Sequence, residues 1–400
     1  MQITRDQVRL MLLAAQGMSA PYPEVVDKNN VIQSIRQMGL LQIDTISVVA
    51  RSPYFVLWSR LGNYEPEWLE DLHREGMLFE YIAHAACFIP IEQYPMLRPD
   101  MGNIDFSWRH SEKYFREHQD LIASILNHIE TNGPVRSADF DSKGKKSNGW
   151  WDWKEEKIAL ENLWSHGDLM VAYRQGFQRY YDLTHKVYPE YSENILTEKQ
   201  AIREKILASI KFLGAARQKW VADFYRLPKG DMAAIIPKLV SSNEIISIPC
   251  VDWNEDILIH PDNLCIYEDV LAGQQIATRT SFLSPFDPVV WDRQRTLELF
   301  DFEYSIECYL PPAKRKFGYF SLPILYRDKL VGRMDAKAHR PKHEFEVRNL
   351  HFEAGFQIES HFLSEFAQAL TSCANWHKAP KILFSENISD KTRQLVEKHF

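Results

Sequence analysis

The chain has 400 residues, of which 45% are apolar and 25% are charged, and its formal net charge is −7. This length predicts two to four domains, and this composition is that of a globular protein that is folded throughout. The negative balance excludes a bulk polycation, so any binding to nucleic acid must use a local basic face.

The N-terminus, MQITRDQVRL, lacks the basic and apolar regions of a signal peptide, and no apolar run is long enough to cross a bilayer. We therefore expect a cytoplasmic protein that does not contact membranes. The five cysteines contain no C-x-x-C pair and their number is odd, which argues against a zinc ribbon, an iron–sulfur cluster or a disulfide framework. Free thiols in a reducing compartment are expected.

The first 110 residues predict several helices followed by extended chain. A capping box at Thr4 begins the first helix, and a second covers residues 27–38. A third is expected from Thr45 and another from Ser52, while residues 77–90 are strand-like. Helices followed by strands are the order of a winged helix–turn–helix.

The same order recurs twice. From residue 111 we expect a long helix, a short helix within residues 132–140, a third helix that ends at Gly167, and a hairpin whose turn is Gln175 and Gly176. Residues 191–265 predict three more helices and two strands. The sequence thus predicts three tandem winged-helix domains, at 1–110, 111–190 and 191–265, with a structural rather than a sequence repeat.

Residues 266–400 have a different pattern. Alternating β-prone runs are separated by breaks at Arg327-Asp328 and Arg340-Pro341, which indicates an antiparallel sheet or small barrel. Helices follow, the last from about Asp390. The expected fold class is therefore α+β, with three winged helices followed by a C-terminal antiparallel β-rich domain.

Two polar side chains interrupt the apolar stretch LLQIDTIS. In an extended segment Gln42 and Asp44 face the same side, while Leu41 and Ile43 anchor the chain to the core. This pattern predicts a rigid platform that presents one amide and one carboxylate together. The alternative is that Asp44 is only the N-cap of a helix that starts at Thr45.

Winged helices most often bind DNA, although they also bind proteins. Basic residues in the second wing lie beside aromatic ones. A run of basic residues, followed by further basic residues, occurs after residue 310. Basic side chains neutralise phosphates, and aromatic rings stack on bases. For the basic residues, the alternative to DNA binding is that they form an ordinary solvated β-face. For His84, the alternative is packing in the core. The DNA-binding or lesion-site candidates are Thr45, Ser47, Arg51, His84, Arg174, Gln178, Arg179, Lys314, Arg315, Lys316 and Arg333.

The segment DSKGKKSNG is a basic loop rather than a phosphate-binding P-loop, because Asp139 occupies the position at which a P-loop requires glycine. This loop either touches a phosphate or is only solvated.

Long stretches of the chain resemble the winged-helix DNA glycosylases of the YcaQ and AlkZ type, and most closely the YcaQ-like branch that repairs interstrand crosslinks. They are LLQIDTISVVARSPYFVLWSRLG, EYIAHAACFIP, GFQRYYDLTHKVYP, SPFDPVVWDRQRTLELFDFEYSIECYLPPAKRKFGYFSLPIL and VGRMDAKAHR. The resemblance covers essentially the whole chain. It implies three winged helices that form a concave DNA-binding scaffold, followed by a C-terminal β-domain.

The resemblance also implies a role for Gln42 and Asp44, because members carry a catalytic Gln-Φ-Gln or Gln-Φ-Asp motif, in which Φ is apolar. Members with the second form excise N7-alkylated guanine and unhook nitrogen-mustard crosslinks. We expect a monofunctional glycosylase without metal or cofactor, acting as a monomer on double-stranded DNA that contains alkylated or crosslinked purines. The rival hypotheses are a non-catalytic DNA-binding regulator and a metal-dependent nuclease; the latter lacks a clustered set of carboxylates.

Overall fold

The computed structural model describes residues 2–102, 111–140, 155–191 and 196–399. The basic loop DSKGKKSNG lies outside them. The chain forms two compact units: unit 1 comprises Met1–Pro66, His84–Ala86 and Ile206–Phe400, and unit 2 comprises Glu67–Ala83 and Cys87–Lys205. This division is coarser than the four domains expected from the sequence, whose boundaries stay a prediction.

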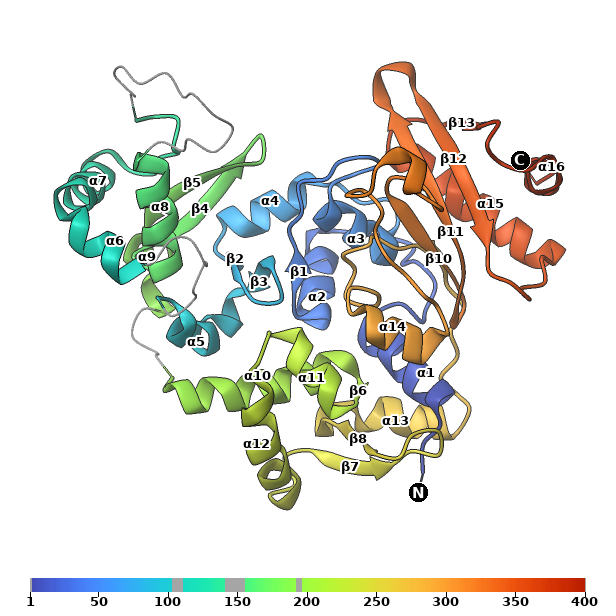
Figure 1. Ribbon diagram of the computed structural model, residues 1–400, viewed down its shortest axis with the longest axis horizontal. Helices are drawn as coiled ribbons and strands as arrows, with labels where there is room; N and C mark the ends of the chain where they lie inside the picture. The colour runs from blue at the N-terminus through green and yellow to red at the C-terminus, as the bar shows by residue number, and fades with distance from the viewer. Residues whose placement is uncertain (1, 103–110, 141–154, 192–195, 400) are drawn as a thin grey trace. The chain divides into compact units, whose positions relative to one another are not determined.

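Unit 1 is built from both ends of the chain (Figure 1). Its helices are α1 Arg5–Ala15, α2 Lys28–Met38, α3 Ser52–Leu61, α11 Gln218–Phe224, α12 Lys229–Ser241, α13 Leu264–Leu271, α14 Arg293–Phe300, α15 Ser360–Trp376 and α16 Asp390–Glu397, and it takes the end of α10 Glu198–Leu213. Its strands are β1 Leu41–Gln42, β6 Ala215–Ala216, β7 Ile246–Pro249, β8 Asp256–Ile259, β9 Thr280–Phe282, β10 Ser321–Tyr326, β11 Lys329–His339, β12 Glu344–Phe352 and β13 Lys381–Phe384.

Unit 2 comes from the middle of the chain. Its helices are α4 Glu67–Arg74, α5 Tyr94–Leu97, α6 Ser111–Glu117, α7 Gln119–Asn132, α8 Glu155–His166 and α9 Thr184–Val187. Its strands are β2 Leu78–Ile82, β3 Ala86–Pro90, β4 Leu169–Gln175 and β5 Gln178–Leu183, where Ala86 itself belongs to unit 1. Within the described parts of the chain, no helix has the length and apolar character needed to cross a membrane.

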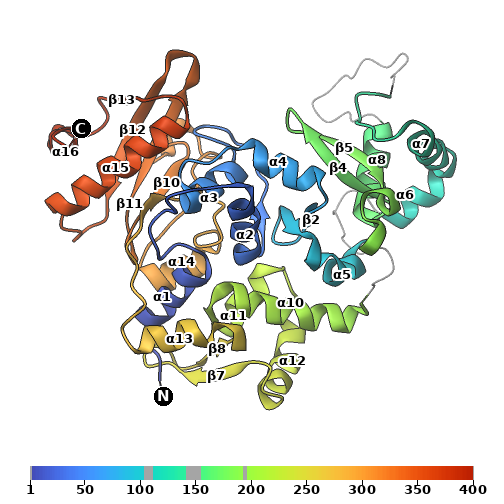
Figure 2. The ribbon, with the colours of Figure 1, turned by 180° about the vertical axis from the view of Figure 1, so that it is seen from behind.

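The C-terminal part of unit 1 is a sheet in the order β13-β12-β11-β10-β9. Neighbouring strands from β9 to β12 are antiparallel, and β10 turns into β11 at Arg327, whose φ is 57°. Strand β13, which the sequence analysis did not anticipate, adds to β12 in parallel. Helix α15 lies against this sheet (Figure 2) and buries an apolar face that includes Phe362, Phe366 and Leu370.

Helix α2 brings the chain to the Gln42–Asp44 segment. It begins with a capping box between Asp27 and Asn30, as the predicted helix boundaries require, and its buried face consists of Val31, Ile32, Ile35 and Met38. It ends at Gly39, whose φ is 80°. A Cβ atom at this position would collide with the ring of Phe212, so both backbone conformation and space require glycine. The chain therefore turns directly from α2 into β1.

Two helix predictions are wrong. No helix begins at Thr45: residues 43–51 are non-helical, and α3 begins at Ser52 with Arg51 in the N-cap position and Pro53 in its first turn. The short helix expected within residues 132–140 is also absent, because the chain there forms a β-bridge from Val135 to Tyr181 and then turns. In both places local turn and strand contacts replace the helix suggested by pattern.

The predicted hairpin in the middle of the chain is confirmed. Strands β4 and β5 pair antiparallel, and the turn residues Gly176 and Phe177 have φ values of 56° and 69°. Such a turn matches the right-handed twist of the strands that it joins. The long helix expected from residue 111 is interrupted at His118, where α6 gives way to α7.

Candidate active site

The segment Ile43–Arg51, here called the thread, is held in place without being helical. At its start the Ile43 N–H donates to the carbonyl of Ala86 over 2.7 Å. Towards its end the carbonyl of Val49 accepts a bond from Nη2 of Arg340, also over 2.7 Å. Such contacts satisfy backbone groups that a helix would otherwise pair internally. The thread is thus a defined platform rather than a loose connection.

Asp44 is half-buried on the thread, and its Oδ1 accepts the backbone N–H of Ile46 over 2.7 Å. Because no helix directly follows Asp44, this bond to the residue two positions on forms an Asx turn, and the N-cap alternative is wrong. Burial raises the pKa of Asp44 above its ordinary value, and the bond from Ile46 offsets part of this effect. No hydrogen bond from the described residues reaches the Oδ2 atom of the same carboxylate, which can accept from water or substrate.

Gln42 is also half-buried and is the last residue of β1. Leu41, before it, is fully buried, and Ile43, after it, makes the bond to Ala86. Burial of Leu41 and the backbone bond of Ile43 therefore fix the chain on both sides of Gln42. Its amide can both donate and accept a hydrogen bond.

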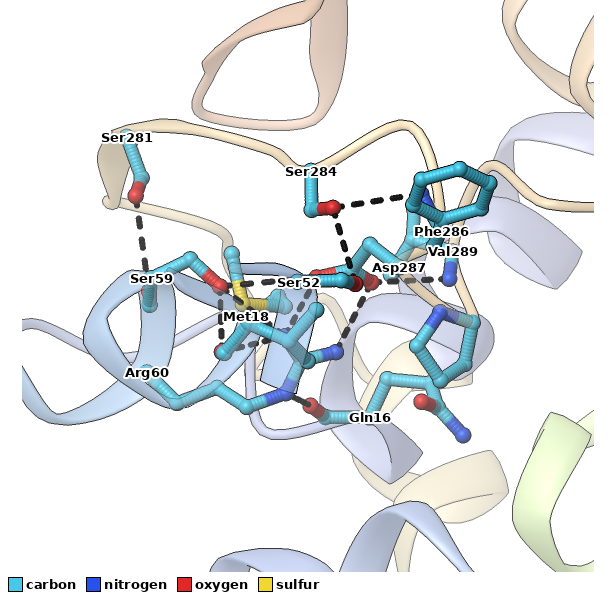
Figure 3. Close-up of polar contacts among 12 residues, drawn as sticks. Gln16, Met18, Ser52, Ser59, Arg60, Ser281, Ser284, Phe286, Asp287 and Val289 are labelled. Carbon is cyan, nitrogen blue, oxygen red and sulfur yellow. Dashed lines mark hydrogen bonds and ion pairs between the residues drawn. The ribbon is translucent and has the colours of Figure 1, made fainter. Parts of the chain in front are cut away.

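A buried ion pair fixes the helix that follows the thread (Figure 3). The guanidinium of Arg60 on α3 binds both oxygens of Asp287 over 2.5 and 3.0 Å, and both side chains are almost fully buried. Nε of Arg60 also donates to the carbonyl of Gln16 on α1 over 3.0 Å. A buried pair of this kind is stable only when its remaining polar atoms are also bonded, as they are here.

Hydrogen bonds near this ion pair also hold the first turn of α3. The hydroxyl oxygens of Ser52 and Ser284 are 3.1 Å apart, and Ser284 also accepts from the backbone N–H of Phe286 over 3.3 Å (Figure 3). Ser284 and Asp287 belong to the stretch SPFDP. This short loop therefore contacts both the first and the last turn of α3. The start of the thread is consequently anchored by its bond to Ala86, and the helix α3 that follows the thread is anchored by the SPFDP loop.

The candidates nearest to Asp44 have different exposures. Thr45 and Ser47 are exposed, and Arg51 is half-buried at the start of α3. Burial, and then the positive charge of Arg51, lower the pKa of Arg340, which bonds Val49 near the end of the thread. Arg340 is thus a site residue that sequence reasoning did not single out.

His84 is buried in unit 1, where its ring stacks on Trp291 with the centroids 4.2 Å apart. Its Nδ1 lies 3.1 Å from the carbonyl of Asp223, and its Nε2 lies 3.2 Å from a guanidinium nitrogen of Arg226. Burial, together with the charge of Arg226, lowers the pKa of His84 to about 3. The ring is therefore neutral at physiological pH and packs as the core alternative expects.

The arginines of the second wing are engaged in unit 2. Arg174 binds both oxygens of the fully buried Glu80 over 2.7 and 2.8 Å, and Nε of Arg179 binds the same carboxylate. Burial alone would raise the pKa of Glu80, but the two guanidinium groups lower it to about 2. Gln178 at the wing tip is exposed and accepts from Arg136 over 3.0 Å.

The other basic candidates also divide into buried residues with internal partners and exposed residues. Arg333 is buried, donates to Glu353 over 2.7 Å, and lies over the rings of Phe302 and Phe317. Lys314 and Lys316 are exposed, whereas Arg315 is half-buried. Lys314 and Lys316 therefore expose their charge to solvent, while the buried arginines serve internal ion pairs. Among the described residues, no group of three His, Cys, Asp or Glu side chains is arranged to hold a metal ion.

Comparisons with known proteins agree with this arrangement. Residues 35–376 match the protein family described as DNA glycosylase AlkZ-like. Among solved structures, the DNA glycosylase AlkZ of Streptomyces sahachiroi has a similar fold: the TM-score is 0.65 and the identity 14%, and the match covers 96% of this chain and 100% of that one. The matched family segment contains the thread and most of both units, and on that ground the chain belongs to the AlkZ-like family of DNA glycosylases.

Proposed function

We propose that this DNA glycosylase hydrolyses the N-glycosidic bond of N7-alkylated purines and unhooks interstrand crosslinks, with Asp44 as its catalytic carboxylate and Gln42 as its positioning amide. The observation that carries the proposal is the state of Asp44. Its carboxylate is half-buried on a non-helical thread, one oxygen is held by Ile46, and burial raises its pKa. A perturbed carboxylate at a fixed position is typical of a catalytic group.

The reaction needs little besides this pair. Alkylation at N7 makes the purine cationic, so it leaves as a neutral base when it takes the electrons of its bond to C1′. Asp44 stabilises the positive charge that develops on the sugar, and accepts the proton of the water that attacks C1′. Gln42 holds that water or the sugar in position. The stretch LLQIDTISVVAR contains no lysine, which favours hydrolysis over a covalent Schiff-base intermediate.

The proposed three winged helices are supported by the connectivity of the strands. In each of three segments, a short strand or bridge is followed by one or two described helices and then by a hairpin, and it pairs with the second strand of that hairpin. The sheet orders are β1-β3-β2 and β6-β8-β7, and Val135 bridges to Tyr181 of β5 in the β4-β5 hairpin. This recurrence is typical of a winged-helix topology.

The proposed DNA contacts are a revised form of the candidate set. We retain Lys314, Arg315 and Lys316, together with Thr45, Ser47 and Arg51 beside the catalytic pair and Gln178 at the wing tip. We leave out Arg174, Arg179, Arg333 and His84, because internal ion pairs or burial occupy their polar atoms. A phosphate cannot compete easily for a guanidinium that already neutralises a buried carboxylate.

A test of the proposal is single-turnover excision from a duplex that contains one N7-methylguanine, with alkali used to cleave the abasic product. We expect Asp44→Asn to bind this duplex normally and to lose excision by about 10²- to 10⁴-fold. Gln42→Ala should lose less, because the charge is kept. Asp390→Asn, which makes the same change on the exposed first turn of α16, is the matched control. Excision by Asp44→Asn at the parent rate would exclude Asp44 as the catalytic carboxylate.

The substrate range is tested with two further duplexes. An N7-linked nitrogen-mustard crosslink should be unhooked, since its leaving base is cationic. A duplex with uracil should be a poor substrate, because a neutral base needs protonation as it leaves and the proposed site has no separate general acid. Efficient removal of uracil without unhooking of the crosslink would contradict the proposed leaving-group chemistry.

A further inference from the structure

The loop between α14 and β10 holds an aromatic side chain in solvent. Tyr309 is 80% exposed, and its neighbour Leu310 is 40% exposed. Among the large exposed apolar residues of the described chain, these two are the adjacent pair, and Tyr309 is the aromatic one. An exposed ring gives up the favourable free energy of burial within the chain, and its face is accessible to a binding partner.

The base of this loop, residues 307–318, is closed by a buried carboxylate. Glu307 is 5% exposed, and its Oε2 accepts the backbone N–H groups of Phe317 over 2.8 Å and of Gly318 over 3.2 Å. Its own carbonyl accepts the N–H of Leu310 over 3.0 Å. Gly318 has a φ of 124°, and a Cβ there would collide with Asp335. The chain thus enters and leaves the 307–318 loop at one fixed point.

The tip of the loop is fixed as well. Nε of Arg315 donates to the carbonyl of Leu310 over 2.9 Å, and its guanidinium lies over the ring of Tyr319, 4.9 Å from the centroid. Consecutive prolines, Pro311 and Pro312, restrict the backbone between these contacts. The exposed ring of Tyr309 is therefore presented by a rigid support.

The proposed catalytic carboxylate acts electrostatically on the start of the 307–318 loop. Burial and then the charge of Asp44 raise the pKa of the Cys308 thiol. The Cys308 thiolate, burial and then Asp44 raise the pKa of the Tyr309 hydroxyl. Asp44 and the whole loop belong to unit 1. The exposed Lys314 and Lys316 follow on the same loop, so cations and an aromatic ring occur together on one support.

We propose that Tyr309, supported by Leu310, stacks on a DNA base beside the damaged nucleotide and so fixes the position of its C1′ atom relative to Asp44. The proposal rests on Asp44 as the proposed catalytic residue. A stacked ring tolerates any base, because every base has a flat face, and it does not require the damaged base to enter a closed pocket. It thus fits a substrate whose base is tethered to the opposite strand.

The test places 2-aminopurine next to N7-methylguanine in a duplex, so that fluorescence reports stacking and alkali cleavage reports excision. We expect Tyr309→Ala to lose most of the binding-induced fluorescence change and to excise about tenfold to a hundredfold more slowly. Tyr309→Phe should restore both, because it keeps the ring. Val251→Ala, which truncates another exposed apolar side chain of unit 1, should behave as the parent protein.

The design separates this inference from the proposed catalytic role. Asp44→Asn should keep the fluorescence change and lose excision. If Asp44→Asn excises normally, the catalytic assignment fails, yet the fluorescence of Tyr309→Ala still decides the stacking role. A folded Tyr309→Ala variant with the parent fluorescence change and the parent excision rate would overturn the inference. So would a Tyr309→Phe variant as impaired as Tyr309→Ala, since the ring would then not be the active feature.

Discussion

The ionised carboxylate of Asp44 lowers the stability of the folded state. Half-burial disfavours its ionised form, and the bond from Ile46 compensates only in part. A carboxyl group whose folded pKa is raised adds stability only below its unfolded pKa, and this contribution is lost as the pH rises. At neutral pH the charge therefore does not stabilise the fold. Such a loss of stability is what the catalytic role proposed for Asp44 would lead us to expect.

The raised pKa of Asp44 predicts how excision depends on pH. Only the ionised carboxylate can accept a proton or stabilise a cationic sugar, so the rate should fall as the pH drops through a pKa above the ordinary 3.8 and should be constant above it. Single-turnover rates on N7-methylguanine DNA between about pH 4 and 8 measure this. The residual rate of Asp44→Asn should lack the same titration. A parent rate that is constant down to about pH 4 would contradict the assignment.

The proposed catalytic pair could be recognised in the sequence because Gln42 and Asp44 lie within one tripeptide. Their surroundings could not: Ala86 and Arg340 are distant in sequence and bond to the thread only in the fold. The helix wrongly expected at Thr45 has the same origin. An aspartate before a β-branched residue suits an N-cap and an Asx turn equally well, and contacts outside the segment select the turn.

At the scale of elements, the β4-β5 wing is stabilised by a buried charge cluster. Glu80 of β2 is fully buried and is neutralised by Arg174 and Arg179, one from each strand of the hairpin. Alternation of basic and aromatic residues in the wing suggested phosphate contacts from sequence. The pattern did not reveal that a carboxylate some ninety residues earlier would take these guanidinium groups, because Glu80 lies in an apolar run.

This cluster predicts opposite behaviour for two sets of basic residues. Arg174→Ala should destabilise unit 2 by about 3 kcal/mol, because it removes one of two partners of a buried charge, and should change the salt dependence of DNA binding little. The double variant Lys314→Ala, Lys316→Ala should leave stability unchanged and reduce the slope of log K against log salt by up to about 2. Urea unfolding and binding titrations at several salt concentrations measure the two effects.

The double variant spares Arg315, whose bond to Leu310 supports the 307–318 loop. It should weaken binding to damaged and undamaged duplexes alike, since phosphate contacts carry no lesion information. A loss confined to damaged DNA would place the lysines at the lesion instead. If Arg174→Ala remains stable and reduces the slope of log K against log salt, Arg174 contacts a phosphate after all.

At the scale of the whole molecule, the order of elements was easier to predict than their grouping. Local signals located most of the helices, the β4-β5 hairpin and the strand-rich C-terminal part, because caps, glycines and alternation act over a few residues. The two compact units combine segments from distant parts of the chain, with Met1–Pro66 and Ile206–Phe400 in one of them. Packing between distant apolar faces decides such a division, and no local pattern encodes it.

Buried neutral histidines occur in both units and predict acid sensitivity of the molecule. Burial, with smaller contributions from neighbouring charges, lowers the pKa of His73 in unit 2 to about 4, and that of His84 and His377 in unit 1 to about 3 and about 4. In the unfolded chain the same groups have the ordinary value of 6.5. Below that pH the unfolded state binds more protons than the folded state, so stability rises with pH and falls on acidification.

We therefore expect the urea midpoint to fall as the pH is lowered from about 6.5 to about 4.5, with each histidine contributing about 1.4 kcal/mol per pH unit. Glu80 contributes little in this window, because its stabilisation is lost mainly as the pH falls from the ordinary pKa of 4.5 toward the folded pKa of about 2. If the units unfold separately, the transition of unit 1 should be about twice as sensitive, since it contains two of the histidines. His361→Gln, which alters an exposed histidine of α15, should keep the full pH dependence. A midpoint that does not change across this range would show that the three rings are protonated in the folded protein.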